Sequence, residues 1–132
     1  MTAWYLDASA IVKLVVPEDE TPALRGWRAA VTSDALVTCE LAVTEVLRAV
    51  GRAGGDVELA QTIVDGLRHV VVDRDLLLAA GRLPPPVLRT LDALHLAAAT
   101  TFGDELAGIV TYDARMADAA ASFGLPTLAP GT

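Results

Sequence analysis

Short apolar runs alternate along the chain with longer stretches in which apolar residues recur every three or four positions. This alternation is typical of an α/β domain, in which strands and helices succeed one another. The pattern predicts five strands, at Ala3–Asp7, Ala35–Thr38, His69–Val72, Gly108–Tyr112 and Pro126–Leu128. It predicts seven helices, at about Ala8–Val16, Thr21–Ala30, Glu40–Arg52, Val57–Leu67, Arg74–Leu83, Arg89–Phe102 and Ala114–Phe123.

Strands that alternate with helices through short connections are expected to be parallel, because right-handed crossovers place the helices on the two faces of the sheet. The continuous apolar runs Val70–Val72 and Ile109–Val110 fit strands that are covered on both faces. Gly124 stands where the cap of the last helix is expected. We therefore predict one domain over residues 1–132, an α/β/α sandwich with a central parallel sheet of four to five strands.

The charge of the chain argues against a broad surface for nucleic acid. The 17 acidic residues outnumber the 10 basic ones, which gives a formal charge of −7. Any contact with nucleic acid must then be local. Charged residues interrupt every apolar run before it reaches the ~18 residues that a membrane helix needs. No signal peptide is recognisable. Cys39 is the only cysteine and cannot form an internal disulfide. We expect a cytoplasmic protein with no membrane partner.

Two carboxylates follow predicted strands. Asp7 closes the first strand, and Asp113 comes one residue after the fourth. In an open parallel sheet, ligands bind beyond the carboxyl ends of the strands, so both positions are candidates for a functional site. The alternative is that both residues only cap the helices that follow, because Asp at that position accepts hydrogen bonds from free backbone N–H groups.

Two further carboxylates lie on helix faces that are otherwise apolar. Glu45 shares its face with Leu41 and Ala49, and Asp92 shares its face with Leu96. An ionised carboxylate on such a face is rare unless it is paired or binds a metal.

Local ion pairs offer a simpler explanation for these two carboxylates. Glu45 could pair with Arg48, and Asp92 with His95, each three residues further along its helix. His95 has an ordinary pKa that would suit a general base. It lies on a different part of the helix surface from Asp92, however, and we expect it to pack in the core.

The predicted topology can bring all four carboxylates to one edge of the sheet. At 4 Å and an effective dielectric constant of 20, each pair of like charges would cost roughly 4 kcal/mol. Either some of the carboxylates are protonated or divalent cations offset this repulsion, and a site made of oxygen ligands suits Mg²⁺ or Mn²⁺ better than zinc. Such ions activate water and stabilise the leaving oxygen in phosphodiester hydrolysis, which is the reaction we predict.

Four segments of the chain resemble, in order and spacing, those of PIN-domain nucleases, and in particular the VapC toxins of bacterial type II toxin–antitoxin systems. They are Tyr5–Leu14 with Glu18, Thr38–Ala49, Leu91–Ala99 and Val110–Met116. The resemblance extends over nearly the whole chain, from about Ala3 to Leu128. It implies the PIN fold and an endoribonuclease that acts on tRNA, rRNA or mRNA.

The resemblance also implies roles for individual residues. An acidic quartet, Asp7, Glu45, Asp92 and Asp113, would bind Mg²⁺ or Mn²⁺ and be catalytic. The hydroxyls of Ser9 and Thr111 resemble groups that support such a site, and Asp118 resembles an accessory acidic residue near the metal. Ser9 and Thr111 would serve equally well as turn or cap hydroxyls. For Asp118 an exposed helix position is the favoured alternative.

Arg115 stands beside Asp113, where it is well placed to meet a phosphate. The implied partners are an RNA substrate, a small cognate antitoxin of the VapB type and a second copy of the chain in a homodimer. Two other functions stay open at this point. One is a PIN nuclease outside toxin systems, acting in RNA maturation or on structured DNA, and the other is a PIN-like binding module without turnover.

Overall fold

The computed structural model describes residues 1–132 and contains five strands, seven α-helices and a short 3₁₀ turn. The strands are β1 (Ala3–Leu6), β2 (Ala35–Cys39), β3 (Arg68–Val70), β4 (Leu106–Val110) and β5 (Thr127–Leu128). The helices are α1 (Ala8–Lys13), α2 (Thr21–Ala30), α3 (Leu41–Arg52), α4 (Val57–Asp65), α5 (Arg74–Gly81), α6 (Thr90–Thr100) and α7 (Ala114–Ser122), and the turn is η1 (Gly103–Glu105).

All five strands form one parallel sheet in the order β3-β2-β1-β4-β5. β1 therefore lies at the centre, where Tyr5 pairs with Val37 of β2 and with Ile109 of β4. Because every strand runs the same way, the carboxyl ends of β1, β2 and β4 lie at the same edge. The predicted parallel sheet is confirmed, with five strands.

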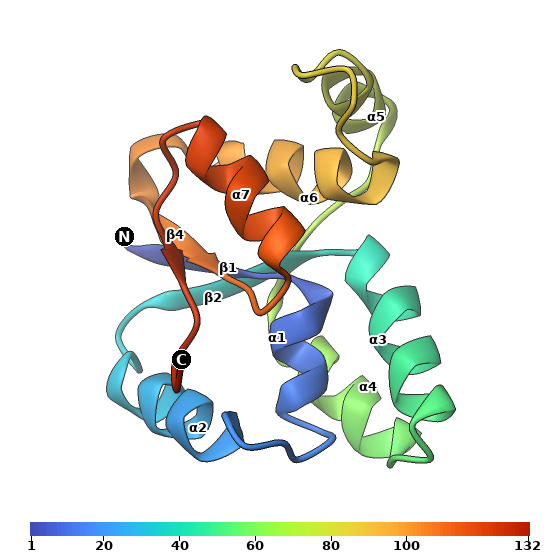
Figure 1. The fold of residues 1–132 in the computed structure, drawn as a ribbon, viewed down its shortest axis with the longest axis vertical. Helices are drawn as coiled ribbons and strands as arrows, with labels where there is room; N and C mark the ends of the chain where they lie inside the picture. Colours follow the sequence, from blue (N-terminus) through green and yellow to red (C-terminus); the bar gives the residue numbers. More distant parts are fainter.

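The helices form a layer on each face of the sheet, so that the predicted α/β/α sandwich is also confirmed (Figure 1). One face packs against α1 to α4 around Leu6 and Val110. The other packs against α5, α6 and α7 around Tyr5 and Ile109. Side chains of successive strand residues point to opposite faces, which explains why neighbours such as Tyr5 and Leu6 enter different halves of the core.

The predicted elements are all present, and their ends differ from the prediction by at most three residues. The largest difference is in α1, which we predicted to reach Val16 and which ends at Lys13. The turn η1 was not predicted, because three residues are too few to establish a helical period. No helix combines the length and the apolar character that a membrane crossing requires.

Gly124 ends α7 in the way its position predicts. Its φ of 68° is in the left-handed region that glycine tolerates best. Its N–H bonds to the carbonyl of Ala121, and the N–H of Leu125 bonds to the carbonyl of Ala120. These two bonds form a Schellman motif, which satisfies carbonyls that the end of the helix would leave free.

The two tryptophans pack against each other on the face that carries α2. The rings of Trp4 in β1 and Trp27 in α2 meet edge to face, with 5.5 Å between their centroids. The indole N–H of Trp4 donates to Asp34. This contact packs α2 against the central strand.

We expect Gly108→Ala to destabilise the fold by about 1–3 kcal/mol, because overpacking a close contact forces neighbouring groups apart. A Cβ at Gly108 would lie 2.9 Å from the carbonyl oxygen of Pro126 and 3.0 Å from the ring of Trp4. Urea unfolding measures the effect. Gly26→Ala in α2 is the matched control, because its Cβ would meet nothing within 4 Å, and it should stabilise the helix by about 0.5–1 kcal/mol. Equal stability of the two variants would contradict the packing argument.

Candidate functional site

Asp7 lies at the carboxyl end of the central strand and is 4% exposed. Its Oδ1 accepts hydrogen bonds from the backbone N–H of Ala10, at 3.2 Å, and from the hydroxyl of Ser9, at 2.6 Å. Its Oδ2 accepts from the hydroxyl of Thr111 at the end of β4. Asp7 therefore does cap α1, as the alternative interpretation expected, and the hydroxyls of the two residues expected to support the site contact it.

The hydroxyls of Ser9 and Thr111 connect the ends of the two central strands. Ser9 Oγ accepts from the N–H of Tyr112 at 2.9 Å, and Thr111 Oγ1 accepts from the N–H of Asp113 at 3.1 Å. Each hydroxyl therefore donates to Asp7 and accepts from the loop that follows β4. The loop that carries Asp113 is tied in this way to the buried carboxylate.

Burial raises the pKa of Asp7 above its ordinary value, although the hydrogen bonds with Ser9, Thr111 and Ala10 act in the opposite direction. The hydrogen bonds therefore offset only part of the cost of burying the ionised carboxylate. A positive charge at the open end of the site would relieve this cost.

Asp113 caps α7, because its carboxylate accepts from the N–H of Arg115 at 3.0 Å. Asp113 is half-buried, whereas Arg115 and Asp118 on the next turns are exposed. The structure therefore bears out the expected exposed position of Asp118. Arg115 forms no ion pair with any carboxylate.

Glu45 and His95 form an ion pair that the sequence did not predict. Glu45 lies half-buried on α3, and its Oε1 is 2.6 Å from Nε2 of His95 on α6. His95 is 3% exposed, as predicted for a histidine of the core. The alternative local pairs of Glu45 with Arg48 and of Asp92 with His95 are not formed, because the imidazole extends across the end of the sheet to Glu45 in the other layer.

Two core groups hold the other side of the imidazole ring. The hydroxyl of Tyr5 is 2.7 Å from His95 Nδ1, and the thiol sulfur of Cys39 is 3.8 Å from the same atom. Burial lowers the pKa of His95, but the hydrogen bonds with Cys39 and Glu45 and the negative charge of Glu45 outweigh it and raise the pKa to about 10. The imidazolium form is therefore favoured, and it donates a hydrogen bond to Glu45.

Asp92 lies half-buried in the first turn of α6, where the helix dipole favours a negative charge. Its pKa is raised by burial first and then by the negative charge of Asp113, with a smaller contribution from Glu45, whereas the positive charges of His95 and Arg89 lower it. Asp92 is therefore within electrostatic reach of two other members of the predicted quartet.

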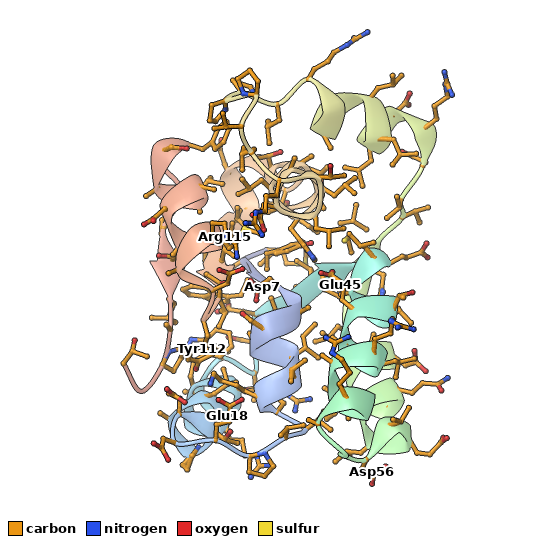
Figure 2. All side chains as sticks on the ribbon, turned by 45° about the vertical axis from the view of Figure 1, so that its right-hand side comes forward. Asp7, Glu18, Glu45, Asp56, Tyr112 and Arg115 are labelled. Atoms are coloured by element: carbon orange, nitrogen blue, oxygen red, sulfur yellow. The ribbon has the colours of Figure 1, made fainter.

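The four predicted carboxylates come from β1, α3, α6 and the end of β4, and all lie toward the carboxyl edge of the sheet. Figure 2 shows Asp7 at the start of α1, with Glu45 on the neighbouring helix α3 and Arg115 on α7. No group of three or more His, Cys, Asp or Glu side chains is close enough to hold a metal ion. Asp7 and Glu45 point instead to the hydroxyl and imidazole partners described above.

The donor set nevertheless fits a hard divalent cation. The available atoms are carboxylate and hydroxyl oxygens, which are the ligands that Mg²⁺ and Mn²⁺ prefer. Burial raises the pKa of both Asp7 and Asp92, and the negative charge of Asp113 adds to the shift at Asp92, so a bound cation would stabilise the ionised form of both carboxylates.

Two clefts adjoin Glu45 and Asp92, and a third, lined by Thr111 and Asp113, adjoins the loop after β4. Of the first two, the larger, of about 710 Å³, lies between α1 and α3 and includes Ser9 and Glu45 in its lining. The smaller, of about 290 Å³, is lined by Asp92 together with Arg115 and Asp118. The candidate site is thus open on more than one side, and both predicted accessory residues of α7 line the cleft at Asp92.

Sequence reasoning missed Tyr5 and Cys39 as partners of His95. Tyr5 is two residues before Asp7, and Cys39 is the last residue of β2, so both precede the carboxyl edge of the sheet. The alternation of side chains along each strand could have identified them. Tyr5 and Cys39 point to the face opposite that of their neighbours Leu6 and Thr38, and α6 covers that face.

Comparison with known proteins identifies relatives along almost the whole chain. The family model of the PIN domain matches residues 4–122. Ribonuclease VapC46 of Mycobacterium tuberculosis is 46% identical over 131 residues, which cover 98% of this chain and 99% of the relative. Ribonuclease VapC47 of the same species is 37% identical, and the match covers 96% of each chain.

A solved structure supports the same fold. The crystal structure of VapC20 from Mycobacterium tuberculosis, described as a sarcin-ricin loop cleaving toxin, superimposes with a TM-score of 0.75. The match covers 96% of this chain and 99% of that one, at 17% sequence identity. At this identity the similarity concerns the three-layer fold.

The ion pair between Glu45 and His95 predicts a specific dependence of stability on pH in metal-free protein. Because the folded pKa of His95 is raised from 6.5 to about 10, the pair contributes fully below about pH 6.5 and loses its contribution as pH rises toward 10. The difference in unfolding free energy between the wild type and His95→Gln should therefore shrink over this range. Urea unfolding at a series of pH values measures it.

Two controls isolate the pair. His69→Gln removes the other histidine, whose ring bonds to the carbonyl of Val64 rather than to a carboxylate. Repeating the series in a Cys39→Ala background removes the thiol that faces the same imidazole. A stability difference that stays constant or grows between pH 6.5 and 10 would contradict a charged pair.

Proposed function

Because this chain belongs to the PIN-domain family and is a ribonuclease of the VapC type, the toxin of a toxin–antitoxin pair, we propose that it hydrolyses RNA phosphodiesters at the carboxyl edge of its sheet. The catalytic and metal-binding residues in this proposal are Asp7, Glu45, Asp92 and Asp113. The observation that supports it most directly is that these carboxylates lie toward one edge of the sheet. In keeping with this placement, the pKa of Asp92 is raised first by burial and then by the negative charges of Asp113 and Glu45. Four acidic side chains in this arrangement favour binding of a divalent cation.

Mg²⁺ or Mn²⁺ is the proposed cofactor. When bound by these carboxylates, such an ion would lower the pKa of a water molecule and neutralise charge on the phosphate. Ser9 and Thr111 would keep both oxygens of Asp7 in fixed positions through their hydrogen bonds. Preorganised ligands of this kind cost less to order when the ion and the substrate arrive.

The remaining predicted residues would act on the substrate side. Arg115 is exposed and free of ion pairs at the cleft that contains Asp92, so its guanidinium can bind a phosphate of the RNA. Asp118 lines the same cleft and would contribute through charge near the metal rather than as a ligand.

The proposed substrate is tRNA, rRNA or mRNA, and the proposed protein partners are a VapB-type antitoxin and a second copy of the chain. A cytoplasmic location follows from the proposed substrate. The relatives named VapC cover nearly the whole chain, which favours the toxin role over a nuclease of RNA maturation or one that acts on structured DNA. All four acidic residues are present, which disfavours a binding module without turnover.

Cleavage of RNA by the purified protein with Mg²⁺ or Mn²⁺ tests the proposal. We expect Asp7→Asn and Asp92→Asn each to lower kcat by more than about 100-fold, because loss of a group that only supports a metal ligand already costs 10–100-fold. Glu40→Gln is the control, since Glu40 is exposed and precedes the same helix that carries Glu45. Full activity in either Asn variant would rule out the proposed site.

Thermal unfolding tests metal binding independently of activity. In the presence of a chelator, Asp7→Asn should melt at a higher temperature than the wild type, because it removes a buried charge whose pKa is raised mainly by burial. Saturating Mg²⁺, at about 100 times its Kd, should stabilise the wild type by about 2.7 kcal/mol and the variant much less. A variant less stable than the wild type without metal would show that the hydrogen bonds of Asp7 outweigh its burial.

A further inference from the structure

The larger cleft has a local excess of positive charge in a chain whose formal charge is −7. It runs beside α1, from Glu45 near the start of that helix to Glu18 beyond its end (Figure 2). Its cationic lining residues are Lys13, Arg48 and Arg52, against the two acidic residues Glu18 and Glu45. A polyanion repelled by most of the surface would therefore meet favourable potential here.

The two arginines are the cations of this cleft that have no ion-pair partner. Lys13 donates to Glu18 at 2.8 Å and to Glu20 at 3.0 Å, so its charge is already balanced. Glu45, the carboxylate one turn before Arg48, pairs with His95 instead. Because the carboxylate of Glu45 contacts the imidazole and Arg48 forms no ion pair, the guanidinium of Arg48 is available to an external anion.

The spacing on α3 suits an extended strand. Glu45, Arg48 and Arg52 follow one another at intervals of three and four residues and line the same cleft. At a rise of 1.5 Å per residue, Arg48 and Arg52 are about 6 Å apart along the helix axis. This separation is comparable with that of neighbouring phosphates along an extended nucleic-acid strand.

We propose that the cleft between α1 and α3 binds single-stranded RNA beside the scissile bond, with Arg48 and Arg52 contacting successive phosphates. The inference rests on the proposed function, and it adds a binding subsite and a direction for the strand, from the carboxylates toward the end of α1. Clefts of roughly 300–1,000 Å³ enclose drug-sized ligands. A volume of about 710 Å³ therefore has room for an unpaired stretch of one or two nucleotides.

The apolar part of the lining supports an unpaired strand. Leu41, Leu91 and Tyr112 contribute to the same cleft, and Leu91 is 47% exposed. Unpaired bases and riboses can pack on apolar and aromatic side chains. In a base-paired helix the faces of the bases are stacked on one another and cannot make these contacts.

The test compares two double variants of the full chain. Arg48→Ala with Arg52→Ala removes the proposed contacts, and Arg74→Ala with Arg82→Ala removes the same charge from exposed positions at the two ends of α5 that do not line the cleft. The probe is a short, unstructured, fluorescein-labelled RNA, whose binding is followed by fluorescence anisotropy at several salt concentrations. Ca²⁺ replaces Mg²⁺ in this assay to limit cleavage.

We expect the first double variant to bind roughly tenfold more weakly, as the loss of two exposed charge contacts implies. Its slope of log affinity against log salt should fall by about 1.4, because a single strand contributes about 0.7 for each neutralised phosphate. The control should change affinity by less than about twofold. In cleavage assays with Mg²⁺, the cleft variant should raise KM with little change in kcat, because the contacts lie beside the reacting phosphate.

Equal weakening in both double variants would overturn the proposal, since the effect would then come from net charge alone. Unchanged RNA binding in the cleft variant would also overturn it. If that variant binds RNA normally but binds a co-expressed antitoxin more weakly, the cleft is a protein-binding site instead. Failure of the proposed function is distinguishable, because a wild type that does not cleave RNA can still show the predicted difference in anisotropy.

Discussion

The parallel pairing of β1 with β4 is the constraint on which the candidate site depends. It sets Leu6 opposite Val110, and the N–H of Asp7 extends the ladder by one further bond to the carbonyl of Val110. Asp7 and Thr111 then leave the sheet side by side, which lets the hydroxyl reach the carboxylate. A shift of one residue in this register would turn Asp7 toward the opposite face, because side chains alternate along a strand.

The acidic residues differ in how far their neighbours stabilise the ionised carboxylate. Asp7 is buried with hydrogen-bond donors but no cation in contact, whereas Glu45 has an imidazolium partner. This difference is consistent with a site in which one carboxylate is rigid and another can exchange partners. Perturbed groups gathered at the edge of a parallel sheet are typical of functional sites, which often give up stability for activity.

Sequence patterns predicted the elements well because apolar spacing directly reflects which side of a strand or helix is buried. They also offered helix capping as one interpretation of Asp7 and Asp113, and both residues do cap helices, because capping depends only on neighbours in the chain. The pairing of Glu45 was beyond such reasoning. A rule based on neighbouring helical turns offered Arg48, while the actual partner is 50 residues away on the opposite layer.

The cleft beside α3 was equally inaccessible to sequence reasoning, because its shape depends on how closely α1 and α3 pack. The roles of the acidic quartet came from family resemblance rather than from spacing alone. Spacing explained why Glu45 and Asp92 were unusual, and the structure adds that both are half-buried rather than enclosed. Their partial exposure is what leaves them accessible to a ligand.

The contact between the two tryptophans also determines what optical spectroscopy can report about this protein. Trp4 and Trp27 are the only indoles in the chain, and neither lines any of the three clefts beside the carboxylates. Their emission will follow the docking of α2 on the central strand, because each ring forms part of the other's environment. Intrinsic fluorescence is therefore a probe of folding in this molecule, and occupancy of the acidic edge will need a reporter placed elsewhere.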